Sequence, residues 1–481
     1  MTAPRATGAH TAHERCQALW APQAWTGAGA AQGWARDVLL EIDGAGRWAS
    51  VHTGVPAAQA AARGAMVLAG PVMPGVINAH SHAFQRAFAG LAERRENEHD
   101  DFWSWRDRMY RVALSVSPDA LRAIATRLYT ELLRGGYTHV CEFHYLHHSL
   151  DGAEYDDPLL MAWTLADAAA DAGIRLTLLP VLYERAGFAL PRLRDDQRRF
   201  ATDARWVLNA QRRLADAFSG EGAPLNAGVA IHSLRAATPE GIAELAQSAD
   251  GPIHIHVAEQ TAEVEDCLKH TGLRPVEWLL RQHALDPRWQ LVHATHVTRE
   301  EIDGVAASGA CAVICPTTEA NLGDGLTDVA AWLDAGTALA MGSDSHVTRD
   351  WREELRLLEY GQRLQRRARN IAASPAAQQP ATAERLFSRM VTGSAAAAGQ
   401  HAWGLVPGAR ADAVLVRYDD DALLGVPPTR LLDAMVFSSP SRRFADVLVA
   451  GRWALRAGSH PRDDAIAGAF RRAMHELWPE S

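Results

Sequence analysis

Histidines and acids recur at the ends of short apolar runs along this 481-residue chain. His80 and His82 are two residues apart, so an extended strand would place both imidazoles on one face. His256 and Asp344 lie at the ends of two later runs of the same kind. Three imidazoles and a carboxylate suit zinc or a neighbouring divalent metal and leave one position open for water. The pattern therefore predicts one divalent metal ion, with Zn²⁺ as the expected identity, bound by these four residues.

A divalent metal would make hydrolysis the chemistry of such a site. A bound ion lowers the pKa of water from 15.7 toward about 7 and so supplies hydroxide at neutral pH. His293, at the end of another apolar run, is a candidate acid–base group beside it. A lone buried histidine more often satisfies a hydrogen bond in the core than binds a metal. The metal interpretation therefore depends on a fold that brings several strand ends to one place.

The elements that could do so are eight apolar runs, each followed by a longer stretch with helical periodicity. The runs cover residues 72–79, 138–145, 174–183, 228–233, 252–258, 290–295, 311–316 and 337–343. Ser117 and Thr238 are expected to cap helices over 118–135 and 239–249. Eight strand–helix units predict an α/β fold of the (β/α)8 TIM-barrel class, whose catalytic residues follow the carboxyl ends of the strands. An open doubly wound sheet is the alternative, but no glycine-rich phosphate turn follows the first run.

Short alternating strands flank the predicted barrel on both sides. They are expected at residues 38–42, 48–52 and 66–69 before it and at 413–418, 447–450 and 452–455 after it. Neither set can bury a face alone, so we expect both to pair into one small composite β-sandwich. The expected division is 1–70 for the first part of the sandwich, 71–403 for the barrel, and 404–481 for the second part, with a terminal helix over 462–477. Residues 1–12 are expected to be loose.

Composition limits the partners of the chain. It carries 48 basic and 57 acidic residues, a net charge of −9, which leaves no basic footprint for nucleic acid or for an anionic membrane surface. No apolar run is long enough to span a bilayer, and the first thirty residues lack the apolar stretch of a signal peptide. The five cysteines lack CxxC spacing, which argues against a disulfide framework and fits a reducing compartment. We therefore expect a cytoplasmic protein with a small-molecule substrate, assembled as a homodimer, the commonest assembly.

The order of the potential ligands resembles that of the amidohydrolase superfamily of metal-dependent hydrolases. The residues that carry the resemblance are Pro74, Gly75, His80, His82, His256, His293 and Asp344. The stretch 404–412 is similar to the segment with which such enzymes return to their N-terminal strands, so the resemblance covers nearly the whole chain. Many members bridge two metals with a carboxylated lysine on the fourth strand. The single lysine here, Lys269, falls in the helix expected after the fifth strand, so the resemblance implies one metal.

Four longer runs resemble one branch of that superfamily, the N-formimidoyl-L-glutamate deiminases. The runs cover residues 80–86, 102–106, 142–145 and 254–260. Members of this branch hydrolyse the formimino group to give N-formyl-L-glutamate and ammonia, a step of histidine degradation. The resemblance assigns substrate binding to Gln85, Arg106, Tyr145, His232 and Arg235. Two of these are arginines, whose guanidinium groups suit planar carboxylates, as a substrate with two carboxylates requires.

The mechanism implied by the resemblance gives three residues catalytic roles. Asp344 accepts a proton from the attacking water, His293 orients the resulting hydroxide, and Glu259 carries a proton to the departing nitrogen. A deaminase of a nucleobase or another aromatic ring is the alternative within the superfamily, but two arginines favour a dicarboxylate. A scaffold that has lost its chemistry would lack ligands, and all four are present. Zinc, iron and manganese all suit such a ligand set.

Several other features are interpreted without a catalytic role. Residues 97–101 are expected to form a solvated lip, and His147 and His148 a loop. The glycines around Asp324 indicate a tight turn rather than a phosphate loop, because the helix and P-loop pattern are missing. Cys141 and Cys315 have no recognisable histidine and base for thiol catalysis.

Overall fold

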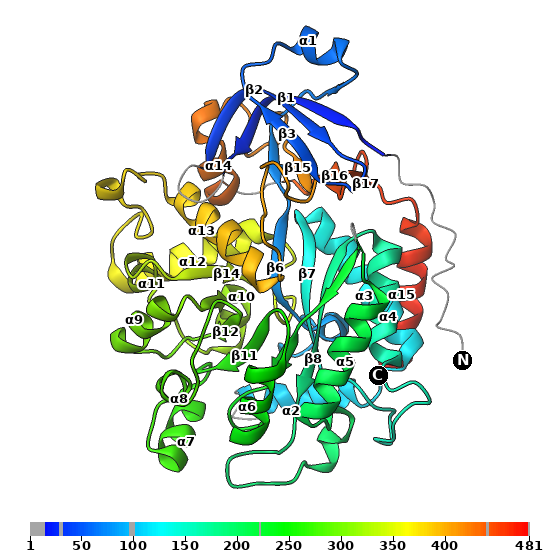
Figure 1. Cartoon of the computed structure of the whole chain (residues 1–481), viewed down its shortest axis with the longest axis vertical. Coiled ribbons are helices and arrows are strands. Elements are labelled where there is room, and N and C mark those ends of the chain that lie inside the picture. The colour runs from blue at the N-terminus through cyan, green and yellow to red at the C-terminus, as the bar shows by residue number, and fades with distance from the viewer. Residues whose placement is uncertain (1–14, 28–31, 96–101, 221–222, 439–441, 480–481) are drawn as a thin grey trace.

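Two sheets organise the chain in the computed structural model (Figure 1). The structure describes residues 15–27, 32–95, 102–220, 223–438 and 442–479. The predicted loose terminus at 1–12 and the predicted lip at 97–101 lie outside the described residues. The expected division of the chain at residues 70 and 403 stays a prediction.

The larger sheet is a parallel barrel. Its strands in spatial order are β6 (Val76–Ser81), β7 (Tyr137–His144), β8 (Arg175–Leu182), β10 (Val229–Ile231), β11 (Ile253–Val257), β12 (Trp289–His293), β13 (Cys311–Ile314) and β14 (Ala338–Met341). A short strand β9 (Leu225–Ala227) pairs with β8 outside this path. The first and last strands meet through a parallel bridge between Ser81 and Asp344, where the Asp344 N–H donates to the His80 carbonyl at 3.0 Å. The prediction of a (β/α)8 barrel is therefore confirmed.

Helices surround this barrel (Figure 1). They are α2 (Phe102–Ala113), α3 (Pro118–Arg134), α4 (Leu160–Ala172), α5 (Ala204–Ala217), α6 (Pro239–Ser248), α7 (Thr261–Thr271), α8 (Pro275–Gln282), α9 (Arg299–Ser308), α10 (Pro316–Leu322), α11 (Val329–Asp334), α12 (Trp351–Arg366) and α13 (Thr382–Ala397). The two predicted caps are confirmed: the Ser117 hydroxyl accepts from the Ala120 N–H, and that of Thr238 accepts from the Gly241 N–H. Each cap satisfies an N–H that the first turn leaves unpaired.

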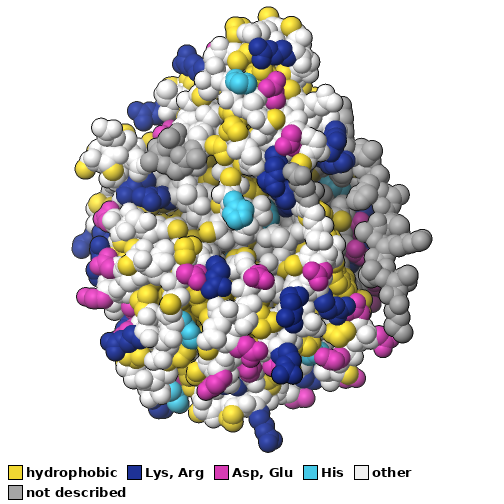
Figure 2. Space-filling model, in the orientation of Figure 1, with side chains coloured by type: hydrophobic (Ala, Val, Ile, Leu, Met, Phe, Trp, Pro, Cys, Tyr) yellow, Lys and Arg dark blue, Asp and Glu magenta, His cyan; other side chains and the backbone are white. Residues whose placement is uncertain are grey.

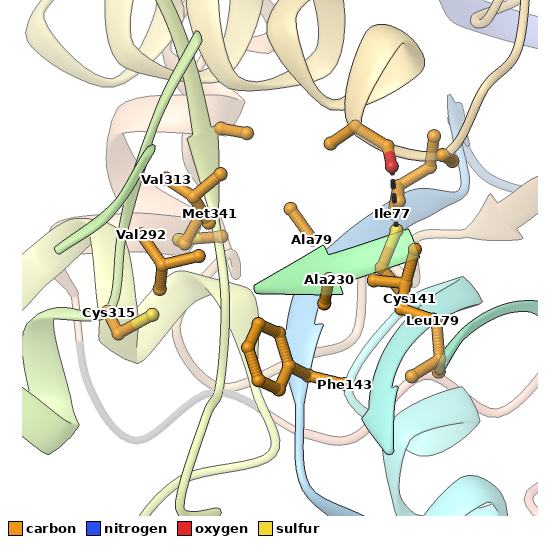
Figure 3. Packing of buried hydrophobic residues seen from close by; sticks show 14 of the residues in the cluster. Ile77, Ala79, Cys141, Phe143, Leu179, Ala230, Val292, Val313, Cys315 and Met341 are labelled. Atoms are coloured by element: carbon orange, nitrogen blue, oxygen red, sulfur yellow. Dashed lines mark hydrogen bonds between the residues drawn. The ribbon is translucent and has the colours of Figure 1, made fainter. Parts of the chain in front are cut away.

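The barrel interior is packed with apolar side chains (Figure 3). Phe143, Ala230, Val292 and Met341 come from different strands and lie within one buried cluster, as expected for a barrel that is a core and not a pore. At its amino-terminal end the Cys141 thiol donates to the Ala397 carbonyl at the end of α13. Burial raises the pKa of the Cys141 thiol and of the Cys315 thiol, which disfavours the thiolate that nucleophilic catalysis needs.

The flanks pair into one composite unit, as predicted. Its strands are β1 (Ala18–Thr26), β2 (Gly33–Ile42), β3 (Trp48–His52), β4 (Met66–Val67), β5 (Val72–Pro74), β15 (Ala413–Leu415), β16 (Val447–Val449) and β17 (Arg452–Leu455). They form a single continuous hydrogen-bonded sheet. Trp48 and Trp453, from opposite ends of that sheet, share one apolar cluster, so the sheet folds back over its own core as a sandwich does. A helix α1 (Ala57–Ala62), a helix α14 (Leu431–Phe437) and the predicted terminal helix α15 (Asp463–Leu477) complete the structure.

The first predicted barrel strand, over 72–79, differs from the observed one. The structure divides it at Gly75 into β5, which belongs to the composite sheet, and β6, which belongs to the barrel. A Cβ at Gly75 would lie 2.2 Å from Oγ1 of Thr138, so only glycine allows this close passage between the sheets. Strand β1 was not predicted at all, because Pro22 interrupts it and its two faces are both largely buried, which removes the alternation that marks a strand.

Charged side chains are dispersed over the surface. On the face shown in Figure 2, basic and acidic groups are interspersed. Within the described residues, no helix combines the length and apolar character needed to cross a membrane.

Candidate metal centre and active-site pocket

Three imidazoles converge at the carboxyl end of the barrel. His80 lies in β6, His82 directly follows that strand, and His256 lies in β11. Nε2 of His80 is 3.1 Å from Nε2 of His82 and 2.9 Å from Nε2 of His256. Oδ1 of Asp344, which follows β14, is 3.4 Å from Nε2 of His80 and 3.3 Å from Nε2 of His82. The structure therefore brings together all four predicted ligands.

The hydrogen bonds of these rings fit a bound cation. Nδ1 of His82 donates to the Phe143 carbonyl at 2.9 Å, and Nδ1 of His256 donates to the His232 carbonyl at 3.0 Å. Both rings therefore present a lone pair at Nε2. Each of these atoms lies close to Nε2 of His80, as expected if a positive centre is bound among the three nitrogens. Tetrahedral zinc ligands at about 2.0–2.1 Å lie roughly 3.3 Å apart, close to the separations here. A hydrogen bond from the other ring nitrogen to a backbone carbonyl is typical of histidines that bind metal.

Glu142 of β7 supports the segment that carries His80 and His82. Its carboxylate accepts from the Ala83 N–H at 2.6 Å and from the Ser81 hydroxyl at 2.7 Å, on either side of His82. Burial raises the pKa of Glu142 to about 7, although these hydrogen bonds favour its charged form. Glu142 belongs to one of the four runs that carry the family resemblance, and no role was predicted for it. Its position at a strand end was the only available signal.

His293 is surrounded by carboxylates. Its Nε2 lies 3.6 Å from Oε1 of Glu259 and 3.8 Å from Oδ2 of Asp344, while its Nδ1 lies 3.4 Å from Oε1 of Glu319. Burial alone would lower the pKa of His293, but the three acids outweigh it and raise the pKa to about 10. His293 and Asp344 have φ values of +70° and +44°, a left-handed backbone that costs energy outside glycine and is concentrated at active sites.

Glu259 is presented by a turn that a second acid fixes. Glu263, in the first turn of α7, accepts the N–H groups of Ala258 at 3.1 Å and Glu259 at 3.0 Å. This pair of bonds accompanies the left-handed backbone of Ala258, whose φ is +53°, and the next residue, Glu259, lines the pocket. Burial raises the pKa of Glu259 to about 7, so its protonation changes near neutral pH. That is the range in which a proton carrier works best.

One pocket gathers the residues predicted for substrate binding. It is lined by Gln85, Arg106, Tyr145, His232 and Arg235, together with Glu259, His293 and Asp344. His82 and His256 reach the same pocket, whereas His80 is fully buried behind them. Nε2 of Gln85 donates to the Tyr145 hydroxyl at 3.1 Å, which fixes both side chains against the metal ligands. All the predicted site residues therefore lie in or directly behind a single cavity.

The cationic part of the pocket is made by the two predicted arginines. Arg106 belongs to α2 and Arg235 follows β10. Burial lowers the pKa of Arg106, and the positive charge of Arg235 nearby lowers it further. The Arg106 guanidinium carbon lies 5.5 Å from the centre of the Tyr110 ring. Tyr110 and Trp105 also line the pocket and were not predicted. A pair of like charges held together favours a ligand with negative charge.

His232 contributes through both its backbone and its side chain. Its carbonyl accepts from Nδ1 of His256, and its ring lies 4.4 Å from that of Tyr183, measured between centroids. Burial lowers the pKa of His232 well below its ordinary value, and Arg235 adds to the effect. The ring is therefore neutral at physiological pH and can serve the pocket as a hydrogen-bonding group.

Other features singled out in the sequence lie elsewhere. His147 and His148 do not line this pocket, and their N–H groups donate to the Arg199 carbonyl at 3.0 and 3.1 Å, as a structured loop would. The predicted tight turn around Asp324 is present, but it follows the short helix α10 and not strand β13 directly. The carboxyl of Asp324 and that of Glu319 lie outside the lining of the pocket, whereas Glu263 lines it. None of the three was predicted, since nothing local distinguishes them from surface acids.

The comparisons with known proteins agree with this geometry. Residues 72–454 match the model of the Amidohydrolase family. A formimidoylglutamate deiminase from Pseudomonas aeruginosa is 44% identical over 448 residues, covering 93% of this chain and 97% of that protein. The crystal structure of an amidohydrolase from Brucella melitensis has a TM-score of 0.88 and 41% identity, covering 96% of this chain and 99% of that one. An atrazine chlorohydrolase from Arthrobacter aurescens TC1, complexed with zinc, shares the fold at a TM-score of 0.81 and 21% identity, covering 95% and 99% of the two chains.

Proposed function

The chain belongs to the amidohydrolase family, and on that basis we propose that it hydrolyses N-formimidoyl-L-glutamate to N-formyl-L-glutamate and ammonia. The observation that carries this proposal is the presence of a four-ligand cluster and two arginines in one pocket. The 44% identity to a formimidoylglutamate deiminase over nearly the whole chain supports it. The activity is a hydrolysis of a carbon–nitrogen bond in a linear amidine.

The substrate matches both parts of the pocket. Its two carboxylates need cationic partners, and the guanidinium groups of Arg106 and Arg235 can each bind a carboxylate through parallel hydrogen bonds. Gln85 and Tyr145 add neutral hydrogen bonds beside the metal ligands. The formimino carbon would then lie near His293, Glu259 and Asp344. A nucleobase has no carboxylate for the two guanidinium groups to bind, which disfavours the aromatic-ring alternative.

The chain's own residues move the protons. A divalent ion held by His80, His82, His256 and Asp344 would lower the pKa of water and supply hydroxide near neutral pH. Asp344 accepts the proton that the attacking water loses, and His293 orients the attacking oxygen through Nε2. The oxygen bonds to the formimino carbon, and Glu259 passes a proton to the terminal nitrogen. The bond from carbon to that nitrogen then breaks, ammonia leaves, and the hydroxyl group on the carbon returns its proton to Glu259, so that the formyl carbonyl remains.

Finer features of the proposal rest on the ligand chemistry and composition. The set of nitrogen and oxygen ligands supports a single zinc ion. We place the reaction in histidine degradation because its substrate is the formimino derivative of glutamate. The five cysteines are all free and buried, which fits a cytoplasmic location. A homodimer remains the expected assembly.

An ammonia-release assay tests the proposal directly. The purified protein is given N-formimidoyl-L-glutamate before chelation, after chelation, and after zinc is restored. We expect ammonia and N-formyl-L-glutamate in equal amounts, loss of activity on chelation and recovery with zinc. N-formimidoyl-L-aspartate serves as a control for chain length, and guanine and adenosine represent the ring deaminases. Turnover of a nucleobase without turnover of the amidine would overturn the proposal, as would full activity in metal-free protein.

A further inference from the structure

A buried acid reaches the pocket wall from the turn after α10. Asp324 is only 5% exposed and lies between Gly323 and Gly325, whose φ values are +71° and +127°. Its N–H donates to the Glu319 carbonyl at 2.9 Å, and its own carbonyl accepts from Nε2 of His296 at 2.8 Å. The turn is therefore built to hold one carboxyl in a defined place, a use that its glycines alone did not indicate.

The partner of that carboxyl is Gln260. Nε2 of Gln260 donates to Oδ1 of Asp324, and Gln260 lines the same pocket as its neighbour Glu259. Because Nε2 of the amide bonds to Asp324, Oε1 is the amide atom that could accept a hydrogen bond from a ligand in the pocket. Gln260 is the N-cap residue of α7, yet its side chain makes no cap hydrogen bond to the described first turn of that helix. The side chain is therefore not used to stabilise the helix.

We propose that Gln260 determines specificity for the formimino group, with its amide oxygen accepting an N–H of the substrate, and that Asp324 is the residue that positions this amide. The inference rests on the proposed function. A formimino group is an amidinium at neutral pH and presents N–H donors on its terminal nitrogen. The formyl product has lost that nitrogen, and its carbonyl oxygen is an acceptor and not a donor.

An acceptor of this kind serves the reaction in a way that the nearby carboxylates do not. Glu259 must gain and lose a proton during the proposed cycle, so it cannot be an acceptor throughout. An amide oxygen does not titrate, so Gln260 stays an acceptor whatever the state of Glu259. When ammonia leaves, the N–H group that the amide accepts leaves with it, and the new carbonyl oxygen supplies no donor to replace it. The site would therefore bind the substrate more tightly than the product, which favours release.

The test compares the binding of substrate and product. In Gln260→Met, the KM for N-formimidoyl-L-glutamate should rise about tenfold, the loss expected for one hydrogen bond to a charged group. The inhibition constant of N-formyl-L-glutamate should stay within about twofold, because the product never used that acceptor. Metal content and melting temperature are measured alongside. Gln211→Met, which removes a buried glutamine outside the pocket, is the matched control and should change neither constant.

A second pair of variants tests the positioning role. Asp324→Ala leaves Gln260 in place but frees its amide, so KM should rise while the inhibition constant of the product does not. Asp324→Asn keeps an acceptor for the Gln260 nitrogen and should restore most of the affinity. Equal shifts in KM and in the product constant, or no shift in either, would overturn the inference. A wild-type protein without activity on the amidine would instead refute the proposed function.

Discussion

The carboxylate of Glu319 lies 3.4 Å from Nδ1 of His293, while Glu259 and Asp344 face the other ring nitrogen. Glu319 is buried and is itself held by the Cys315 N–H, which donates to the same oxygen at 2.9 Å. With a pKa of about 10 the His293 ring carries a proton on each nitrogen near neutral pH, so an acceptor fixed at Nδ1 sets how the ring is oriented. Nε2 is thereby directed to the reacting side of the pocket.

Glu319→Gln should therefore lower kcat about tenfold and leave KM within about twofold, the size seen when outer partners of catalytic histidines are lost. Metal content should be unchanged, since Glu319 touches none of the four ligands. Steady-state kinetics and metal analysis check this. Glu354→Gln is the control, because Glu354 is equally buried but binds Thr317 and not His293. An unchanged kcat in Glu319→Gln would show that the ring needs no such partner.

The second prediction separates the proposed metal ligand of β11 from another histidine of the same strand. His256→Gln removes one of the convergent nitrogens, so bound zinc and activity should both fall at least a hundredfold. His254→Gln is the matched control: His254 lies two residues earlier on the same face, but its Nε2 donates to the Ala397 carbonyl at 2.9 Å. It should keep its metal. Metal analysis of both purified variants decides the matter, and equal zinc in the two would contradict the assignment.

The third prediction concerns recognition of the carboxylates. Arg235→Lys keeps the positive charge but loses the paired hydrogen bonds of a guanidinium, so KM should rise about tenfold or more with a smaller change in kcat. Arg185→Lys is the control, because Arg185 lies at the same end of the barrel, outside this pocket, and donates to the Leu234 carbonyl at 2.9 Å. An unaltered KM in Arg235→Lys would remove that residue from substrate binding.

The fourth prediction is a pH dependence of stability. Burial lowers the pKa of His254 from its ordinary 6.5 to about 4. Between those values the unfolded chain binds the proton and the folded chain does not, so the free energy of unfolding falls as pH falls from 6.5 to 4. The loss attributable to His254 is about 3 kcal/mol at pH 4. Relative to wild type, His254→Gln should gain stability as the pH is lowered through this window. Thermal melting of both proteins across the window measures this difference. A gap in melting temperature that does not change with pH would contradict this.

Sequence patterns predicted the barrel and its ligands because both depend on short-range signals. A ligand such as His256 sits at the end of an apolar run, and parallel strands bring such ends together without further information. Glu142, Glu319 and Asp324 could not be found in this way. Each supports a residue that is remote in sequence or separated from it by a turn, and an isolated acid is most often a solvated one. Their roles depend on packing that no local pattern encodes.

The join between β6 and β14 has a consequence for assembly of the enzyme. The bridge from Ser81 to Asp344 closes the barrel between its first and last strands, and the proposed cation would be bound by residues from both. Because its proposed ligands come from both of these strands, the ion would hold the two strands together. Its affinity is then coupled to closure of the barrel, so that ion uptake and completion of the fold reinforce each other. A nascent chain that ends before residue 344 has the three imidazoles but not the carboxylate, and the site is completed only when β14 and Asp344 are added.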